Sequence, residues 1–164
     1  MAECKSVMPQ LHLPVQSGDN EVLKRMNRKY TFEHYMTLIE KLKTNIPGIS
    51  ITTDIIVAFP GETEEQFQHT LDLVEEVGFE GAFTFIYSPR EGTPAAKMED
   101  SIDMETKHRR LEELISYINK DALKRNEEYV GKVVKVLVEG TSKRNDDILS
   151  GYSFVKIYCI ISLC

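Results

Sequence analysis

The stretch TTDIIVAFPGETEEQFQ, residues 52–68, contains in succession most of a strand, a tight turn and the start of a helix. Residues 50–59 are rich in β-branched side chains and too short for a typical helix, which predicts a strand. A Pro-Gly pair ends the strand, and Thr63 begins a helix with Gln66 three residues later as its capping-box partner. We therefore expect a strand–loop–helix unit of an α/β fold.

Strand and helix patterns alternate on both sides of this unit. Helix-linked strands pair in parallel through right-handed crossovers, so the alternation predicts a parallel sheet of at least three strands. Such a sheet is either open or part of a (β/α) barrel. The other expected elements are a strand at 11–15, helices at 20–29, 32–46, 63–77 and 103–127, and a strand at 81–88.

The pattern changes after residue 128. Residues 131–140 alternate valines with polar neighbours, which predicts a half-buried strand of an antiparallel β-module. TSKRNDD is then expected to be a loop, and further strands should follow it. We therefore divide the chain into an α/β domain, 1–128, and an incomplete β-module, 129–164.

Composition narrows the class of protein. No window approaches the roughly 18 apolar residues of a membrane span, and MAECKSVMPQ lacks the features of a signal peptide. We therefore expect a cytoplasmic protein without membrane contact. Three cysteines, Cys4, Cys159 and Cys164, show no CxxC or CxxxCxxC spacing and predict no metal or iron–sulfur site. The net charge of −6 argues against a strongly basic nucleic-acid surface, while a local basic patch remains compatible with it.

Asp54 is the unusual residue of the strand at 50–59. Strand alternation places Thr53, Ile55 and Val57 on an apolar face suited to packing under helices, and Asp54 on the opposite face. A buried, unpaired carboxylate is costly, so Asp54 needs hydrogen-bond donors or water. These hydrogen-bond partners come either from a ligand or a polar barrel interior, or from nearby backbone N–H groups and threonine hydroxyls.

Three glycine-bearing loops, QSGDN, FPGET and SPREGTP, each follow a predicted strand. The carboxyl ends of parallel strands meet at one edge, where α/β proteins bind ligands. Gly61 permits close approach of the backbone to a ligand, and the N-terminus of the helix starting at Thr63 favours an anion. We therefore expect the three loops to share one rim and to form a small-molecule site.

LHLPVQSGDNEVLKRMNRKY, ITTDIIVAFPGETEEQFQHTL and AFTFIYSPREGTPAAKM closely resemble the C-terminal half of the radical S-adenosylmethionine methylthiotransferases, over roughly residues 1–152. AFTFIYSPREGTPA favours the tRNA subgroup that converts N6-isopentenyladenosine to its 2-methylthio form. The subgroups acting on threonylcarbamoyladenosine or on a ribosomal protein usually differ there.

The resemblance implies the latter part of a partial (β/α) barrel, followed by the start of a small RNA-binding β-domain of the TRAM type. It implies S-adenosylmethionine and [4Fe–4S] clusters as cofactors. Its partners are the anticodon stem-loop of tRNA and the N-terminal half that carries the cluster cysteines. In the family, S-adenosylmethionine is cleaved to a radical that abstracts hydrogen from adenine C2, where sulfur is then delivered. The positions implied near the cofactor are Gln16, Ser17, Gly18, Asp54, Phe59, Pro60, Gly61, Tyr87 and Ser88.

The chain departs from the family pattern in three ways. The CxxxCxxC loop is absent, so we expect the isolated chain to be inactive. Ala58 stands where the family usually has glycine. After Tyr152, SFVKIYCIISLC replaces a polar continuation, which suggests a truncation or a reading-frame change and an aggregation-prone strand.

Basic residues are candidates for RNA contacts. Lys24, Arg25, Arg28 and neighbouring Lys29 either contact tRNA phosphates or form a solvated helix face, and Arg90 in a rim loop suits a phosphate or carboxylate. Tyr87 either stacks on a base or packs. The four histidines lack ligand spacing and are expected to be structural or on the surface.

Two other functions remain open. One is an RNA-binding fragment without catalysis, which rests on the segment after residue 131. The other is a barrel aldolase or hydratase with Asp54 and Glu62 as acid and base. The second would need a further charged group such as a lysine on the rim, and FPGE and YSPR provide none.

Overall fold

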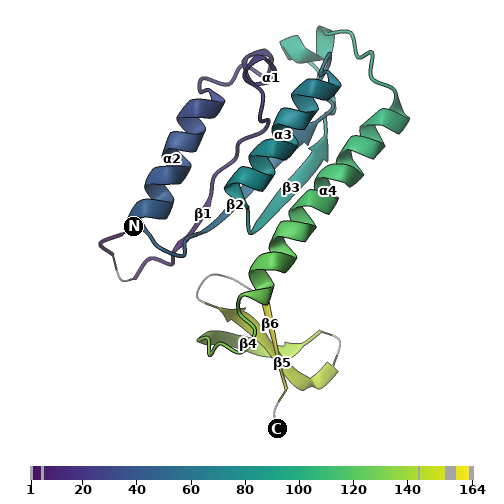
Figure 1. The fold of residues 1–164 in the computed structure, drawn as a ribbon. Helices are drawn as coiled ribbons and strands as arrows, with labels where there is room; N and C mark the ends of the chain where they lie inside the picture. The colour runs from purple at the N-terminus through teal and green to yellow at the C-terminus, as the bar shows by residue number, and fades with distance from the viewer. Residues whose placement is uncertain (1, 5, 144, 154–157, 163–164) are drawn as a thin grey trace.

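The computed structural model describes residues 2–4, 6–143, 145–153 and 158–162. It contains two sheets, joined in the chain by the long helix α4, Met104–Glu127 (Figure 1). The first sheet is parallel, with strand order β1-β2-β3, as the alternating pattern predicts. Its register places His12 beside Thr52 and Asp54 beside Phe83. The strands are β1 (Gln10–His12), β2 (Ser50–Val57) and β3 (Gly81–Ile86).

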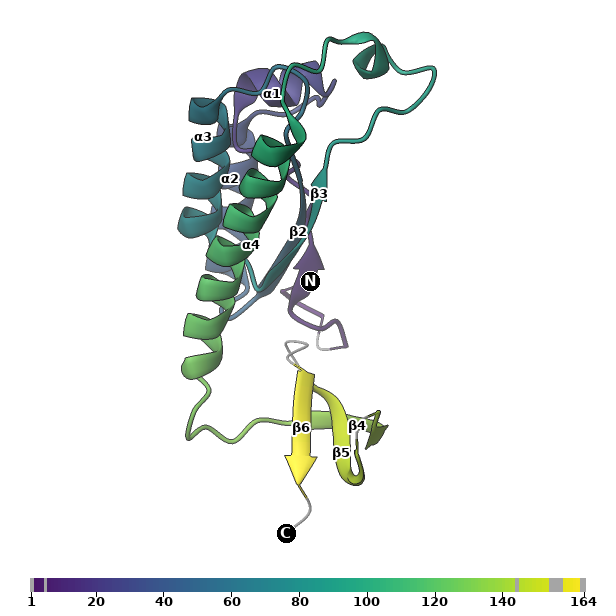
Figure 2. The same cartoon turned by 90° about the vertical axis from the view of Figure 1, so that its right-hand side faces the viewer.

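Helices cover only one face of this sheet, and the opposite face is bare (Figure 2). Thr53, Ile55 and Val57 are buried on the covered face, whereas Asp54 points to the other side. The helices are α1 (Asn20–Arg25), α2 (Phe32–Asn45), α3 (Glu64–Val77) and α4 (Met104–Glu127), with a short 3-10 helix, η1 (Pro94–Lys97), after β3.

Helix boundaries follow the expected signals closely. Thr63 and Gln66 form the predicted capping box of α3, and Gly78 ends the helix in the left-handed region with φ 58°. Helix α1 is shorter than expected and ends at Arg25. On α4, Leu114 is buried as expected but Leu123 is 61% exposed, because the last turns of α4 extend beyond β2 and β3 (Figure 1).

The second sheet is antiparallel, with order β4-β5-β6. Two boundaries differ from the expectation: the first strand begins at Val136 rather than 131, and the expected loop TSKRNDD already contributes Asn145 to β5. Residues 158–162 of the divergent end pair with β5, whereas 154–157 and 163–164 lie outside the described residues. The strands are β4 (Val136–Ser142), β5 (Asn145–Ser153) and β6 (Tyr158–Ser162).

The second sheet lies beyond the C-terminal end of α4 (Figures 1 and 2). Leu137 is 75% and Ile160 66% exposed, and no apolar side chain is buried in the described part of this sheet, whereas an independent β-module needs a shared hydrophobic core. Among the described residues, no helix is long and apolar enough to cross a membrane.

Candidate functional site

The loops that follow β1, β2 and β3 enclose one cavity of about 930 Å³ at the carboxyl ends of the strands. Gln16 from the first loop, Phe59 from the second and Tyr87 from the third all line it. The expectation that three separate loops share one rim is therefore confirmed. The volume lies in the range of ordinary ligand pockets.

Gln16 extends the sheet by bridging to β2. Its N–H donates to the Asp54 carbonyl at 2.8 Å, and its carbonyl accepts from the N–H of Ile56 at 2.9 Å. Its backbone is in the left-handed region, with φ 71°. Its side-chain oxygen accepts from Arg28 Nη2 at 2.9 Å, which fixes both side chains at the cavity wall.

Ser17 and Gly18 do not line the cavity. Ser17 is fully buried and its hydroxyl accepts from the Asp19 N–H, while the Gly18 N–H donates to Thr70 Oγ1 at 3.0 Å. A Cβ at Gly18 would lie 2.3 Å from the His69 carbonyl oxygen. These two residues therefore dock the loop on α3, and the geometry does not support the direct cofactor contact expected of them.

The loop after β2 is held by a buried ion pair. Ala58 has φ 57°, a conformation that explains why glycine suits this position. The Ala58 N–H donates to Glu62 Oε2 at 2.8 Å, and Arg110 Nη1 donates to the same oxygen at 3.0 Å. Burial raises the pKa of the Glu62 carboxyl, against the lowering effect of the Ala58 N–H and Arg110. Glu62 is buried in the ion pair and does not line the cavity, so the geometry gives no support to an Asp54–Glu62 acid–base pair.

Arg25 anchors the same loop from the side of α1. Its Nη1 donates to the Pro60 carbonyl at 2.8 Å and its Nη2 donates to Gln66 Oε1 at 2.9 Å. A Cβ at Gly61, where φ is 73°, would lie 2.7 Å from Arg25 Nη1. Pro60 and Gly61 therefore shape the loop rather than line the cavity.

The basic residues of α1 and the following turn do not form one solvated face. Lys24 is exposed and lies 3.8 Å from Glu21, whereas Arg25 and Arg28 line the cavity. Arg25 donates to the β2 loop and to α3 through its two terminal nitrogens, which gives it a structural role, and its phosphate contact stays a prediction. Arg28 remains exposed at the cavity mouth.

The third loop contributes an aromatic and polar wall. Tyr87 packs edge-on against Phe59, with ring centroids 4.9 Å apart. Its Oη is buried and has no hydrogen-bond partner among the described residues. Ser88 and Arg90 line the cavity beside it and are exposed. Tyr87 therefore packs, and also presents an unsatisfied polar atom next to the cavity.

Asp54 faces the bare side of the sheet, as its strand position predicts. Its Oδ1 lies 3.3 Å from His12 Nε2, and His12 Nδ1 lies 3.0 Å from Thr52 Oγ1. Asp54 also lines the cavity, and Ile56 and Phe85 form the apolar floor beside it. The carboxylate is thus supported by an imidazole from the neighbouring strand, a partner that the sequence analysis had not assigned.

Comparisons with known proteins agree with this architecture. Residues 1–74 match the radical SAM superfamily. The structure of coproporphyrinogen III oxidase from Escherichia coli, a radical SAM enzyme, superposes with a TM-score of 0.58 at 18% identity, covering 88% of this chain and 40% of that one. This likeness supports the α/β architecture expected from the sequence.

Proteins similar in sequence to this chain include tRNA-2-methylthio-N(6)-dimethylallyladenosine synthases. The protein of Anoxybacillus flavithermus is 57% identical over 153 residues, or 93% of this chain. Those of Bacillus thuringiensis and Bacillus anthracis are 55% identical over 148 residues, or 90% of this chain. The chain spans 29% of the length of each of these relatives.

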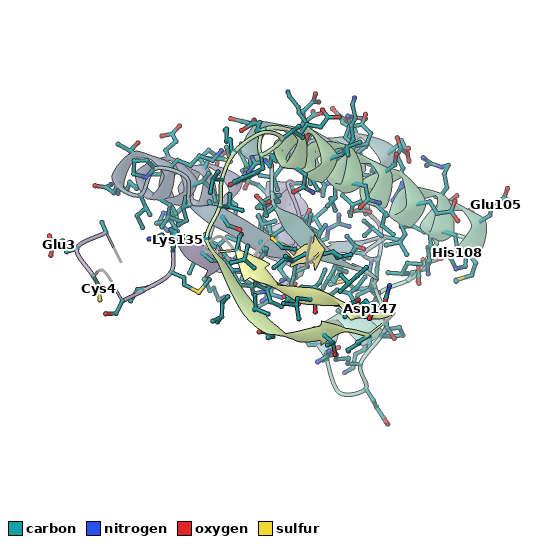
Figure 3. The ribbon with its side chains drawn as sticks, turned by 90° about the horizontal axis from the view of Figure 1, so that it is seen from below. Glu3, Cys4, Glu105, His108, Lys135 and Asp147 are labelled. Atoms are coloured by element: carbon teal, nitrogen blue, oxygen red, sulfur yellow. The ribbon has the colours of Figure 1, made fainter. Side chains whose placement is uncertain are left out.

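Within the described residues, no group of three or more His, Cys, Asp or Glu side chains could hold a metal ion. Cys4 is exposed in the N-terminal segment, far from Glu105 and His108 on α4 (Figure 3), and Cys159 lies in β6. Cys164 lies outside the described residues. The part of the chain that the structure describes therefore does not fit an iron–sulfur cluster.

Proposed function

We propose that this chain is part of a tRNA methylthiotransferase that modifies N6-dimethylallyladenosine, and that the cavity at the ends of β1–β3 holds S-adenosylmethionine. The observation that carries the proposal is the convergence of Gln16, Phe59 and Tyr87 on one cavity in a chain 57% identical to a synthase of that name.

The cavity suits a zwitterionic nucleoside. Phe59 and Ile56 offer apolar surface for a purine ring, and the unpartnered Oη of Tyr87 offers a hydrogen bond to a polar atom of the ligand. Arg28 suits the ligand carboxylate. Gln16 and Ser88 supply further polar contacts.

The chain's own residues orient the ligand rather than transform it. S-adenosylmethionine supplies the methyl group and the hydrogen-abstracting adenosyl group. Glu62 and Arg110 hold the Ala58–Phe59 backbone at the cavity wall, and Arg25 holds Pro60. Because the described residues do not fit a cluster, we infer that the isolated chain binds ligand without turnover.

RNA contacts form a second part of the proposal. Arg90 lies at the cavity mouth and Lys24 is exposed on α1, where both would meet phosphates of a tRNA anticodon stem-loop entering from that side. The sheet β4–β6 would serve as the TRAM-like RNA-binding unit. The alternative of an RNA-binding fragment without a cofactor predicts tRNA binding but no binding of an adenosyl ligand.

Calorimetric titration with S-adenosylhomocysteine tests the cavity. We expect saturable binding that Tyr87→Ala and Arg28→Met each weaken about tenfold, the effect of losing one good contact. Lys24→Met is the matched control because Lys24 is a nearby basic residue, on α1, that lies outside the cavity. Absence of binding by the folded chain, or equal loss in the control, would refute the proposal.

A further inference from the structure

The bare face of the first sheet carries an unusual combination of side chains. Phe83 is 63% and Phe85 52% exposed, although faces of parallel sheets are ordinarily covered. Beside them, Asp54 on β2 pairs with His12 on β1, and these side chains are 30% and 42% exposed. A face meant only to pack against another element would be apolar throughout, because burying a carboxylate is costly.

These side chains adjoin the proposed cofactor cavity. Asp54 and Phe85 line its floor, and Phe83 lies beside Asp54 in the strand register. The ring of His12 lies edge-on to Phe83, with centroids 5.9 Å apart. The face therefore continues the cavity along β2 and β3 toward the other end of the strands, as one surface with an apolar and an acidic part.

The chemistry of this surface discriminates between N6-substituted adenines. A carboxylate accepts a hydrogen bond from an exocyclic N–H, and exposed phenyl rings suit a branched hydrocarbon tail attached to the same nitrogen. A tail ending in a carboxylate would instead meet the negative charge of Asp54 and the apolar rings. His12 holds Asp54 in place and blocks one of its oxygens.

We propose that Asp54, Phe83 and Phe85 form the subsite that selects a prenylated adenine over a threonylcarbamoylated one. Asp54 accepts the N6–H, and Phe83 and Phe85 contact the dimethylallyl group. The inference rests on the proposed function, because it assumes that the adenosyl ligand occupies the adjoining cavity. It assigns substrate selection to β2 and β3 themselves.

Competition between free nucleosides tests the assignment. The chain, saturated with S-adenosylhomocysteine, is titrated with N6-dimethylallyladenosine, adenosine and N6-threonylcarbamoyladenosine while its amide NMR signals are followed. We expect the prenylated nucleoside to bind about tenfold more tightly than adenosine, since added apolar groups in a pocket are worth about that much or more. We expect the threonylcarbamoylated one to bind most weakly.

The variants separate the two parts of the surface. Phe83→Ala and Phe85→Ala should remove the preference for the prenylated nucleoside, whereas Phe83→Leu should keep part of it. Asp54→Asn should narrow the gap between adenosine and the threonylcarbamoylated nucleoside. Leu123→Ala, at an exposed apolar residue on α4, is the control and should change nothing.

Each outcome decides between the claims. The subsite is overturned if the chain binds S-adenosylhomocysteine normally but binds no nucleoside, or binds the nucleosides without preference. Either result leaves the proposed function standing. A preference that survives Phe83→Ala and Phe85→Ala also overturns it. Loss of S-adenosylhomocysteine binding by the folded wild-type chain overturns the proposed function instead.

Discussion

Replacing Arg110 with methionine should expose the importance of the buried ion pair behind the cavity. The side chains of Arg110 and Glu62 are 5% and 1% exposed, and Arg110 Nη1 donates to both the carboxylate and the carbonyl of Glu62. The guanidinium also lies over the Phe67 ring at 5.5 Å. Methionine keeps much of the apolar contact with Phe67 but leaves the Glu62 carboxylate buried without its cation.

The expected cost follows from that geometry. Removing one partner of a buried ion pair destabilises a protein by about 3 kcal/mol or slightly more. For a chain of this size, that corresponds to a fall in Tm of roughly 6–12 °C. The cost should shrink as the pH falls, because the pKa of Glu62 is already raised by burial and would rise further without Arg110, so the carboxyl takes up a proton.

Urea unfolding followed by circular dichroism, at neutral pH and near pH 4.5, measures both effects. Arg109→Met is the matched control: Arg109 pairs with Glu64 at 2.7 Å, but the two side chains are 48% and 60% exposed. Exposed pairs contribute at most about 1 kcal/mol. A loss in Arg110→Met no larger than in Arg109→Met, or one independent of pH, would refute the reasoning.

Three further outcomes follow from the loops. Gly18→Ala should lower the free energy of unfolding by about 2 kcal/mol in urea titrations, because its Cβ would lie 2.3 Å from the His69 carbonyl oxygen and the backbone must shift; an unchanged midpoint would count against the docking role. Ala58→Gly should raise thermal stability by about 0.5–1 kcal/mol, since φ is 57° there; a decrease would contradict the strain. Burial raises the pKa of Glu62 in the folded state, so the free energy of unfolding of the wild type should fall as the pH rises above 4.5 through that pKa, relative to Glu62→Gln. Unfolding free energies of the two proteins that change in parallel with pH would disprove this.

Local signals predicted the first sheet and its helices well. The capping box at Thr63, the left-handed Gly78 and the alternation around Asp54 depend only on neighbouring residues, and all three are confirmed. The shared rim also followed from the sequence, because parallel strands joined by helices must end at one edge.

The partners of the site residues depend on register and packing that no local pattern contains. His12 meets Asp54 because β1 pairs beside β2, about 40 residues along the chain. Arg110 reaches Glu62 from a helix 48 residues away. Arg110 lies in a charged stretch of the long helix α4, and its sequence context there does not reveal that its side chain is buried.

The second sheet shows the opposite error. TSKRNDD has the composition of a loop, yet Asn145 and Asp147 belong to β5. Both are exposed, so polar composition there reflects solvent contact rather than the absence of a strand.

Hydrogen–deuterium exchange with and without S-adenosylhomocysteine tests most directly that loops from three strands build one ligand cavity. The account predicts simultaneous protection of the segments around Gln16, Phe59 and Tyr87, with no change in β4–β6. Protection of only one of these segments, or of the second sheet instead, would contradict it.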